Sequence, residues 1–150
     1  MAITAGQKLT ASRLNIRTVR ARRTTTLSLT SGTLTAVTLD TSDFDNSSMF
    51  TPGGSLITLP IAGVWGFQVY GSFASNATGQ RRFLMEIGTT GVYTGIDSRP
   101  AVSGDVTHIT LSGSYVASAG DQLRVVAHQT SGGALNLLAG LYITAWYVAS

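Results

Sequence analysis

The chain has 150 residues, of which 43% are hydrophobic, and a formal net charge of +3. This length suits one domain with a substantial core, and the hydrophobic content excludes a disordered chain. Charged residues make up only 11% of the sequence, against about 25% in an average soluble protein. A surface so poor in charge favours a protein that buries part of itself against other subunits.

Other protein classes are excluded by signals that the sequence lacks. There is no cysteine, so disulfide bonds and thiolate metal sites play no part. No apolar run approaches the roughly 18 to 20 residues that span a bilayer. The first six residues lack the basic-then-apolar order of a signal peptide. We therefore expect synthesis in a cytoplasm without an export signal, and no membrane partner.

The positive charge is concentrated at the start of the chain, where residues 1–24 hold six cations and no acid. The remaining residues hold four arginines and seven acids. We predict that residues 1–32 form a basic N-terminal arm with a function separate from that of the body. The six cations of this arm are Lys8, Arg13, Arg17, Arg20, Arg22 and Arg23.

The arm also contains the one helical pattern in the sequence, "TASRLNIRTVR". Thr10 is a residue type that caps helix N-termini. Arg13, Arg17 and Arg20 follow at spacings of four and three, which would place them on one helical face. A short helix is therefore an option here. Beyond it, the β-branched residues of "RTTTLSLTSG" favour strand.

The body, residues 33–150, consists of short alternating segments separated by turns. The clearest segment is "GVWGFQVYGSFAS", in which bulky residues alternate with small or polar ones. Its bulky residues are Trp65, Phe67, Val69 and Phe73. A period of two indicates a half-buried antiparallel strand, and Gly71 on its bulky face leaves room for a facing side chain.

Similar alternation follows in "RRFLMEIG", "VTHITLSGSYVAS" and "AGDQLRVVAHQTSG". The apolar "ALNLLAGLYITAWYVAS" closes the chain as one or two strands, which belong inside a sheet because an exposed apolar edge would invite aggregation. About eight to ten strands without helices between them predict an all-β fold, namely an antiparallel sandwich, barrel or jelly roll.

Two parts of the sequence resemble known families. "ITAGQKLTASRLN" resembles an N-terminal segment of structural proteins from tailed bacteriophages and their prophages. The body resembles the trimeric jelly roll of tumour necrosis factor and of the globular complement heads. The matching stretches are "FDNSSMFTP", "LITLPIAGVWGFQVYGSFAS", "GQRRFLMEIGTTG", "YVASAGDQLRVVAHQTSGG" and "GLYITAWYV". This resemblance implies a homotrimer and places Phe44 under the sheet. The chain lacks the collagen stalk and the cysteines of vertebrate members, so their receptor-binding residues are not carried over.

Catalytic patterns are absent from the sequence. Glu86 is the only glutamate, which excludes a pair of glutamates acting as acid and base. No "GxSxG" motif accompanies the many serines. The two histidines, His108 and His128, fall on the polar faces of their strands, where we expect hydrogen bonds at the surface or between subunits. We therefore predict a protein that is not an enzyme and needs no cofactor.

Two loops hold candidate binding residues. In "DTSDFDN", the residues Asp40, Asp43 and Asp45 offer oxygen ligands that suit calcium, although their spacing is not that of an EF-hand. Aspartate and asparagine also bond their own backbone in turns, which is the role we favour, with calcium as the weaker alternative.

The second loop leads into "GQRR", where loops on a rigid β scaffold often carry binding residues. Its candidates for a ligand or a contact between subunits are Asn76, Gln80, Arg81 and Arg82. Alternation sends the two arginines to opposite faces, and Glu86 or Asp121 is a candidate partner for one of them. For sugar stacking the candidates are Tyr70, Tyr93 and Tyr115, for which we favour core or interface packing.

The basic arm has three interpretations. Arginine binds the phosphates of nucleic acids, but no helix-turn-helix or zinc pattern accompanies the arm and the body has no basic face. A solvated basic tail is the second interpretation. We favour docking to an acidic protein surface, because arginine forms bidentate bonds with carboxylates.

Together these features predict a non-enzymatic virion protein. Three copies of its jelly-roll knob would be docked by the arm onto capsid or tail proteins. The knob would decorate or stabilise the particle, or contact the host surface, with a host glycan as a candidate ligand. The alternative is a free-standing carbohydrate-binding or adhesive β module.

Overall fold

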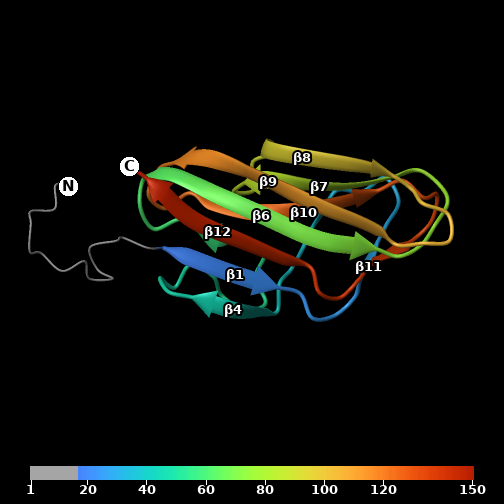
Figure 1. The fold of residues 1–150 in the computed structure, drawn as a ribbon, viewed down its shortest axis with the longest axis horizontal. Helices are drawn as coiled ribbons and strands as arrows, with labels where there is room; N and C mark the ends of the chain where they lie inside the picture. Colours follow the sequence, from blue (N-terminus) through green and yellow to red (C-terminus); the bar gives the residue numbers. More distant parts are fainter. Residues whose placement is uncertain (1–16) are drawn as a thin grey trace, which may run out of the picture.

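The computed structural model describes residues 17–150, and its regular secondary structure is entirely β-strand. Twelve strands in this part of the chain form two antiparallel sheets that pack face to face (Figure 1). The all-β antiparallel sandwich predicted from the sequence is therefore confirmed. The strands exceed the predicted eight to ten because several pieces of only two or three residues count separately.

The first sheet, sheet A, holds seven strands. Its wide part has the order β4–β1–β12–β6–β9, while β11 and β2 pair with each other beside the end of β6. The strands of sheet A are β1 (Thr18–Arg22), β2 (Leu27–Leu29), β4 (Thr41–Asp45), β6 (Gly63–Phe73), β9 (Thr107–Ala117), β11 (Leu135–Leu137) and β12 (Tyr142–Ala149).

The second sheet, sheet B, has the order β3–β10–β7–β8, with β5 also paired to β10. Its strands are β3 (Thr35–Ala36), β5 (Ile57–Thr58), β7 (Gln80–Ile87), β8 (Val92–Pro100) and β10 (Gln122–Gln129). Strands that are distant in sequence are neighbours in both sheets, as when β1 lies beside β12 near the end of the chain.

The core lies between the two sheets and is built by alternation along the long strands. The bulky side of β6 faces inward as predicted, with all four of its large residues buried. They meet buried residues of β7 and β10, and the rings of Phe73 and Phe83 lie 5.1 Å apart. A Cβ added at Gly71 would lie 2.7 Å from the Phe83 ring, which confirms that this glycine makes room for a facing side chain.

The start of the sandwich lies earlier in the chain than we expected. Residues 18–32, which we assigned to the arm, contribute β1 and β2 to sheet A. Val19 and Ala21 are buried, so this segment alternates with the period of a strand. The option of a helix is therefore wrong where it includes residues 18–20, and its earlier part lies outside the described residues. The division at residue 32 falls inside the sandwich.

The two ends of the sandwich differ. Strand β1 begins and β12 finishes at the same end, where the Tyr147 amide donates to the Arg17 carbonyl at 2.9 Å (Figure 1). The loops that follow β6, β8 and β10 lie together at the opposite end. Within residues 17–150, no helix is long and apolar enough to cross a membrane.

Candidate subunit interface

The outer face of sheet A carries aromatic side chains that the core does not cover. Side chains alternate along a strand, so the residues between the core positions of β6, β9 and β12 point outward. We call this surface the aromatic face. Its residues are Thr18, Arg20, Arg22, Phe44, Val64, Gly66, Gln68, Tyr70, Ser72, His108, Thr110, Ser112, Ser114, Val116, Tyr142, Thr144 and Trp146.

One row of side chains crosses all five strands of the aromatic face. The Tyr70 ring stacks between His108 and Tyr142, with centroid distances of 6.1 and 5.6 Å. The guanidinium carbon of Arg20 lies 4.7 Å from the Tyr142 centroid and 5.6 Å from that of Phe44. The row therefore runs from β9 through β6, β12 and β1 to β4 as a continuous stack.

Arg20 holds the middle of this row through both its charge and its donors. A guanidinium over an aromatic ring gains about 0.5–1 kcal/mol at exposed sites. Its Nε also donates to the Thr144 hydroxyl at 3.0 Å. The side chain that we expected to serve the arm is thus fixed within the sheet.

At the other end of the row, two hydroxyl groups lie within hydrogen-bond distance of the His108 imidazole. Its Nδ1 lies 2.7 Å from Ser72 Oγ and 3.2 Å from the Tyr70 hydroxyl. A serine and a histidine at this distance form part of a hydrolase triad, which also requires a carboxylate to orient the imidazole. Among the described residues no carboxylate bonds His108. The pair lies on the open surface of a sheet, where it ties β9 to β6.

Trp146 covers the part of the aromatic face nearest the chain ends. It is 38% exposed and lies against Gly66, where a Cβ would clash with the indole ring. Val116 on β9 is 75% exposed and pairs with Val64. Large apolar side chains with this exposure, grouped on one face, are typical of surfaces that bind a partner.

The aromatic face has little charge to keep it in water. Its cations are Arg20 and Arg22, and the one carboxylate at its edge in the described structure is Asp43, which pairs with Arg22 at 2.9 Å. The rest of the polar groups are hydroxyls, the Gln68 amide and the His108 imidazole. The aromatic face is therefore a part of the surface in which the low charge content of the sequence is apparent.

Phe44 corrects an expectation from the sequence. We placed it under the sheet, but it is 42% exposed on the aromatic face and lies beside Arg20. A bulge in the β1–β4 pairing, between Arg20 and Ala21, shifts the register of β4. Asp45 instead faces the inner side, opposite Val19.

The arm cations that the structure describes bond other residues of the β-sandwich. Arg17 donates to Ser47, and Arg23 donates to the Thr38 and Thr26 carbonyls. Together with the contacts of Arg20 and Arg22, these bonds fasten β1 and the following loop to their neighbours. Lys8 and Arg13 lie outside the described residues, so docking by the arm stays a prediction.

The structure places the two arginines of the "GQRR" loop in different surroundings. Arg81 is 0% exposed and donates to the carbonyls of Asn76, Thr78 and Gln80, so it fastens its own loop. Its burial lowers the pKa of its guanidinium. Arg82 points to the other face, as alternation predicted, and donates to the Gln80 side chain at 2.7 Å. Binding of a ligand or a second subunit at this loop stays a prediction.

The three aspartates of the other loop act on the protein itself. Asp45 accepts from the amides of Ser47, Met49 and Phe50, and Asp40 accepts from the Thr24 amide. Burial alone would raise the pKa of Asp40, but the bonds from Thr24 and the Arg23 charge lower it overall. No three candidate metal ligands come together within residues 17–150. The backbone role that we favoured holds for Asp40 and Asp45, whereas Asp43 pairs with the Arg22 side chain.

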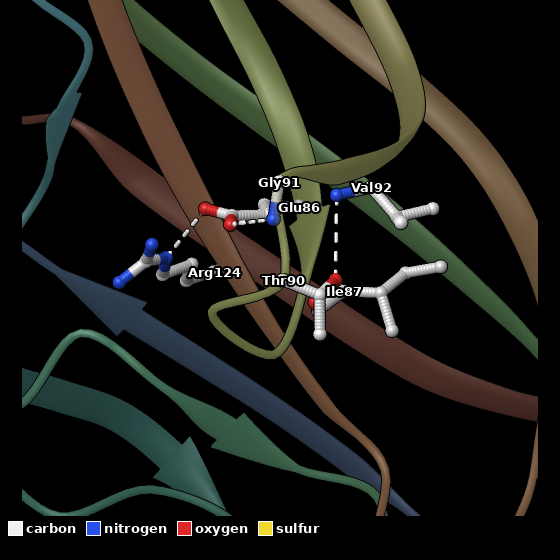
Figure 2. A network of polar contacts seen from close by, with 6 residues as sticks. All are labelled: Glu86, Ile87, Thr90, Gly91, Val92 and Arg124. Atoms are coloured by element: carbon white, nitrogen blue, oxygen red, sulfur yellow. Dashed lines mark hydrogen bonds and ion pairs between the residues drawn. The ribbon is translucent and has the colours of Figure 1, made fainter.

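The candidate partner Glu86 binds a different arginine from the two we considered. Its carboxylate receives Arg124 Nε at 2.6 Å and the Gly91 amide at 2.7 Å (Figure 2). The bond from Arg124 is the main reason why the pKa of Glu86 is lowered, against the opposing effect of burial. The turn between β7 and β8 is held closed as a result. Asp121 instead accepts from the Tyr115 hydroxyl at 2.9 Å, which raises the pKa of Tyr115.

The remaining histidine and tyrosines do not form a common site. His128 lies on β10 of sheet B, opposite Arg82. Tyr93 lies on β8 of the same sheet, while Tyr115 packs against the core. Of the three tyrosines considered for sugar stacking, Tyr70 alone belongs to the aromatic face. A sugar platform built from all three tyrosines is therefore excluded by their positions.

The two antiparallel sheets and their crossing connections define a jelly-roll head. No family model and no curated protein sequence matches this chain.

Solved structures identify the particular type of jelly roll. Murine APRIL at pH 8.5 superimposes with a TM-score of 0.68 and 12% identity, covering 89% of this chain and all of that one. The globular domain of zebrafish complement 1qA gives 0.63 and 12%, covering 88% of this chain and 97% of that one. Eiger TNF from S. frugiperda gives 0.62 and 10%, covering 90% and 94%. The chain therefore has the tumour necrosis factor and complement 1q fold, as the sequence resemblance implied.

Sequence reasoning missed most of the aromatic face. The outward positions of Tyr70, Ser72 and His108 were predicted from alternation, but their stacking with Tyr142 and Arg20 was not. That contact depends on the pairing of β1 with β12, which joins two ends of the chain. The signal that could have found it is the period of two in "TVRAR", which alternates small apolar residues with arginines.

Proposed function

We propose that this chain is a non-enzymatic structural protein of a bacteriophage virion. Three copies of the head associate through the aromatic face, and the N-terminal segment docks the assembly onto capsid or tail proteins. There it decorates or stabilises the particle, or contacts the host surface. The observation that carries this proposal is the exposed aromatic face, which is poor in charge and backed by a rigid sheet.

Burial of the aromatic face supports association of the heads with one another. Each buried Å² of apolar surface contributes about 25 cal/mol, and stable interfaces bury roughly 800 Å² on each partner. A closed ring needs a contact in which one patch meets a different patch of the next copy. The five-stranded face offers two such patches, the β9 side and the β1–β4 side. The number three comes from the resemblance to trimeric heads.

The virion role is supported by the N-terminal sequence. "ITAGQKLTASRLN" resembles segments of phage structural proteins, and it includes Lys8 and Arg13. These are the arm cations that remain for an acidic docking surface once Arg17, Arg20, Arg22 and Arg23 are engaged in the head. Strand β1 begins at one end of the sandwich, so a docked segment before it would leave the loops after β6, β8 and β10 facing away from the particle.

The association is tested by sedimentation velocity with two matched substitutions. Val116→Asp adds a carboxylate to the aromatic face, and Ile96→Asp adds one to sheet B at a residue that is 57% exposed. Both positions are open, so both variants should fold. We expect Val116→Asp to weaken assembly at least about a hundredfold, because a carboxylate would lose its hydration where an apolar side chain is buried. Ile96→Asp should sediment as the unsubstituted protein does.

Either of two results would contradict the proposed assembly. One is a single 15.7 kDa species for the unsubstituted chain at micromolar concentration. The other is an equal effect of the two substitutions, which would mean that the aromatic face is not the contact.

A second function is favoured by the surroundings of Trp146. An exposed indole lying against Gly66, with Gln68, Thr144 and Ser114 nearby, offers one apolar ring among neutral hydrogen-bonding groups. That combination suits a saccharide. A monomeric head whose tryptophan fluorescence changes with a particular glycan, and no longer does so in Trp146→Ala, would favour the adhesive module over the virion trimer.

A further inference from the structure

The sequence contains two histidines, and the fold places them on different sheets. His108 lies on the aromatic face, in contact with Ser72 and Tyr70, whereas His128 lies on β10 of sheet B. Histidine is the side chain whose ordinary titration falls between pH 5 and 8. Of the two histidines, His108 is therefore the one on which an added proton would bring charge onto the aromatic face.

We propose that association through the aromatic face requires neutral His108, so that the assembly dissociates as the pH falls. The inference rests on the proposed association of heads and adds a regulation to it. It follows from the position of the imidazole, the groups around it and the lack of a carboxylate bonded to it within residues 17–150.

The groups facing His108 are neutral or positive. From β6 they are the Ser72 and Tyr70 hydroxyls. Along the same row follow Tyr142 from β12 and Arg20 from β1, and Arg22 lies opposite Tyr142. The acids on the neighbouring elements are engaged or off the sheet. Asp43 pairs with Arg22, and Asp105 precedes β9 and accepts from the Val106 amide. On β8, which packs beside β9, Asp97 pairs with Arg99.

Hydrogen bonding on the face is satisfied with a neutral imidazole. With the proton on Nε2, Nδ1 is an acceptor and the Ser72 hydroxyl donates to it at 2.7 Å. A second proton on Nδ1 turns that acceptor into a donor, so the hydroxyl must reverse. The added charge must then be buried against a neighbouring head without a counter-ion, which is unfavourable.

The arrangement of a ring adds repulsion to this desolvation. Heads that close a ring bring the β9 side of one copy against a different side of the next. On the aromatic face the opposite side is the one that carries Arg20 and Arg22. A charged His108 would meet like charges there, and each ring would contain three such contacts.

The test measures the dissociation constant of the full-length assembly by sedimentation between pH 8 and pH 5.5. Each histidine that must lose its proton on assembly changes the constant by about tenfold per pH unit below its titration range. For three heads we expect a steep rise in the dissociation constant as the pH falls, with the heads themselves remaining folded by circular dichroism.

Two substitutions at His108 and one control separate the causes. His108→Gln keeps a neutral acceptor, so its assembly should be independent of pH in this range. His108→Lys carries a permanent charge and should assemble poorly even at pH 8. His128→Gln is the control, since it removes the other histidine of the sequence. It should behave as the unsubstituted protein does, because His128 lies on sheet B and not on the aromatic face.

The inference is overturned if the unsubstituted assembly has the same stability at pH 8 and pH 5.5. It is also overturned if His108→Gln keeps the full pH dependence. Failure to associate even at pH 8 has a different meaning, since it overturns the proposed function and removes the basis of this inference with it.

Discussion

Individual charged side chains in this fold have structural roles that their positions in the sequence do not reveal. Arg81 and Arg82 are adjacent, yet one is enclosed by three carbonyls of its own loop and the other lies on the outer side of sheet B. Alternation predicted that they separate. It could not predict which arginine the core would accept, because the carbonyls come from a loop whose shape depends on the rest of the fold.

At Glu86 the structure predicts a stability that depends on pH. Its pKa is lowered in the folded state, so the carboxylate stabilises the fold above its ordinary pKa of 4.5, and this contribution is lost as the pH falls through the lower folded pKa. Glu86→Gln should lower the free energy of unfolding at pH 7 by about 3 kcal/mol, because Arg124 loses its partner. The variant should also lose part of the acid sensitivity, measured by urea unfolding between pH 7 and pH 3.

An exposed pair on the same sheet provides the comparison. Arg99 and Asp97 lie 3.1 Å apart on β8, and the arginine is largely in water. Asp97→Asn should change the free energy of unfolding by less than about 0.5 kcal/mol. Equal losses in the two variants would show that the enclosed bond from Arg124 has no special value.

Among the elements, the long strands were predictable and the short, distant pairings were not. The inward and outward sets of β6 and β9 follow from a period of two, which the sequence shows directly. Strand β1 has the same period, but its arginines suggested an arm because charge usually indicates exposure. In the fold those arginines lie over aromatic rings and beside hydroxyls, while Val19 and Ala21 complete the core.

The pairing of β1 predicts different outcomes for two truncations. Removing residues 1–16 leaves every described strand intact, so the head should keep its thermal midpoint within about 2 °C. Removing residues 1–24 deletes β1, which pairs with β12 on one side and β4 on the other. That variant should unfold or aggregate, because an apolar central strand becomes an edge. Circular dichroism and light scattering distinguish the two.

The shorter truncation also tests docking. A folded head without residues 1–16 should be missing from purified particles, while the full chain is present. Normal incorporation of this truncated head would mean that the arm does not dock it. The truncation to residue 24 cannot make this distinction, since loss of β1 would remove the head itself.

For the whole molecule, the class of fold was predictable and the candidate contact surface was only partly so. Low charge content predicted buried subunit contacts, and the resemblance to jelly-roll heads implied three copies. Neither property says which sheet would be buried. That depends on where Phe44, Tyr142 and Trp146 emerge, which is fixed by the register of strands far apart in the sequence.

Association of folded heads also predicts that thermal stability depends on protein concentration. Assembly stabilises the folded state by mass action, so a hundredfold increase in concentration should raise the unfolding midpoint by about 5 °C. Calorimetry at two concentrations measures this shift. Val116→Asp should unfold at a midpoint that does not change with concentration, and Ile96→Asp should keep the dependence. A constant midpoint for the unsubstituted protein would contradict association.

The shared position of Arg17 and Ser150 has a practical consequence for display. A cargo fused after Ser150 would emerge beside the start of β1 and leave the opposite end of the sandwich uncovered. Peptides grafted into the loop between β8 and β9, at that opposite end, would instead point away from the start of β1. The two ends of the sandwich therefore offer separate fusion sites, one beside the chain termini of the sandwich and one at the loops.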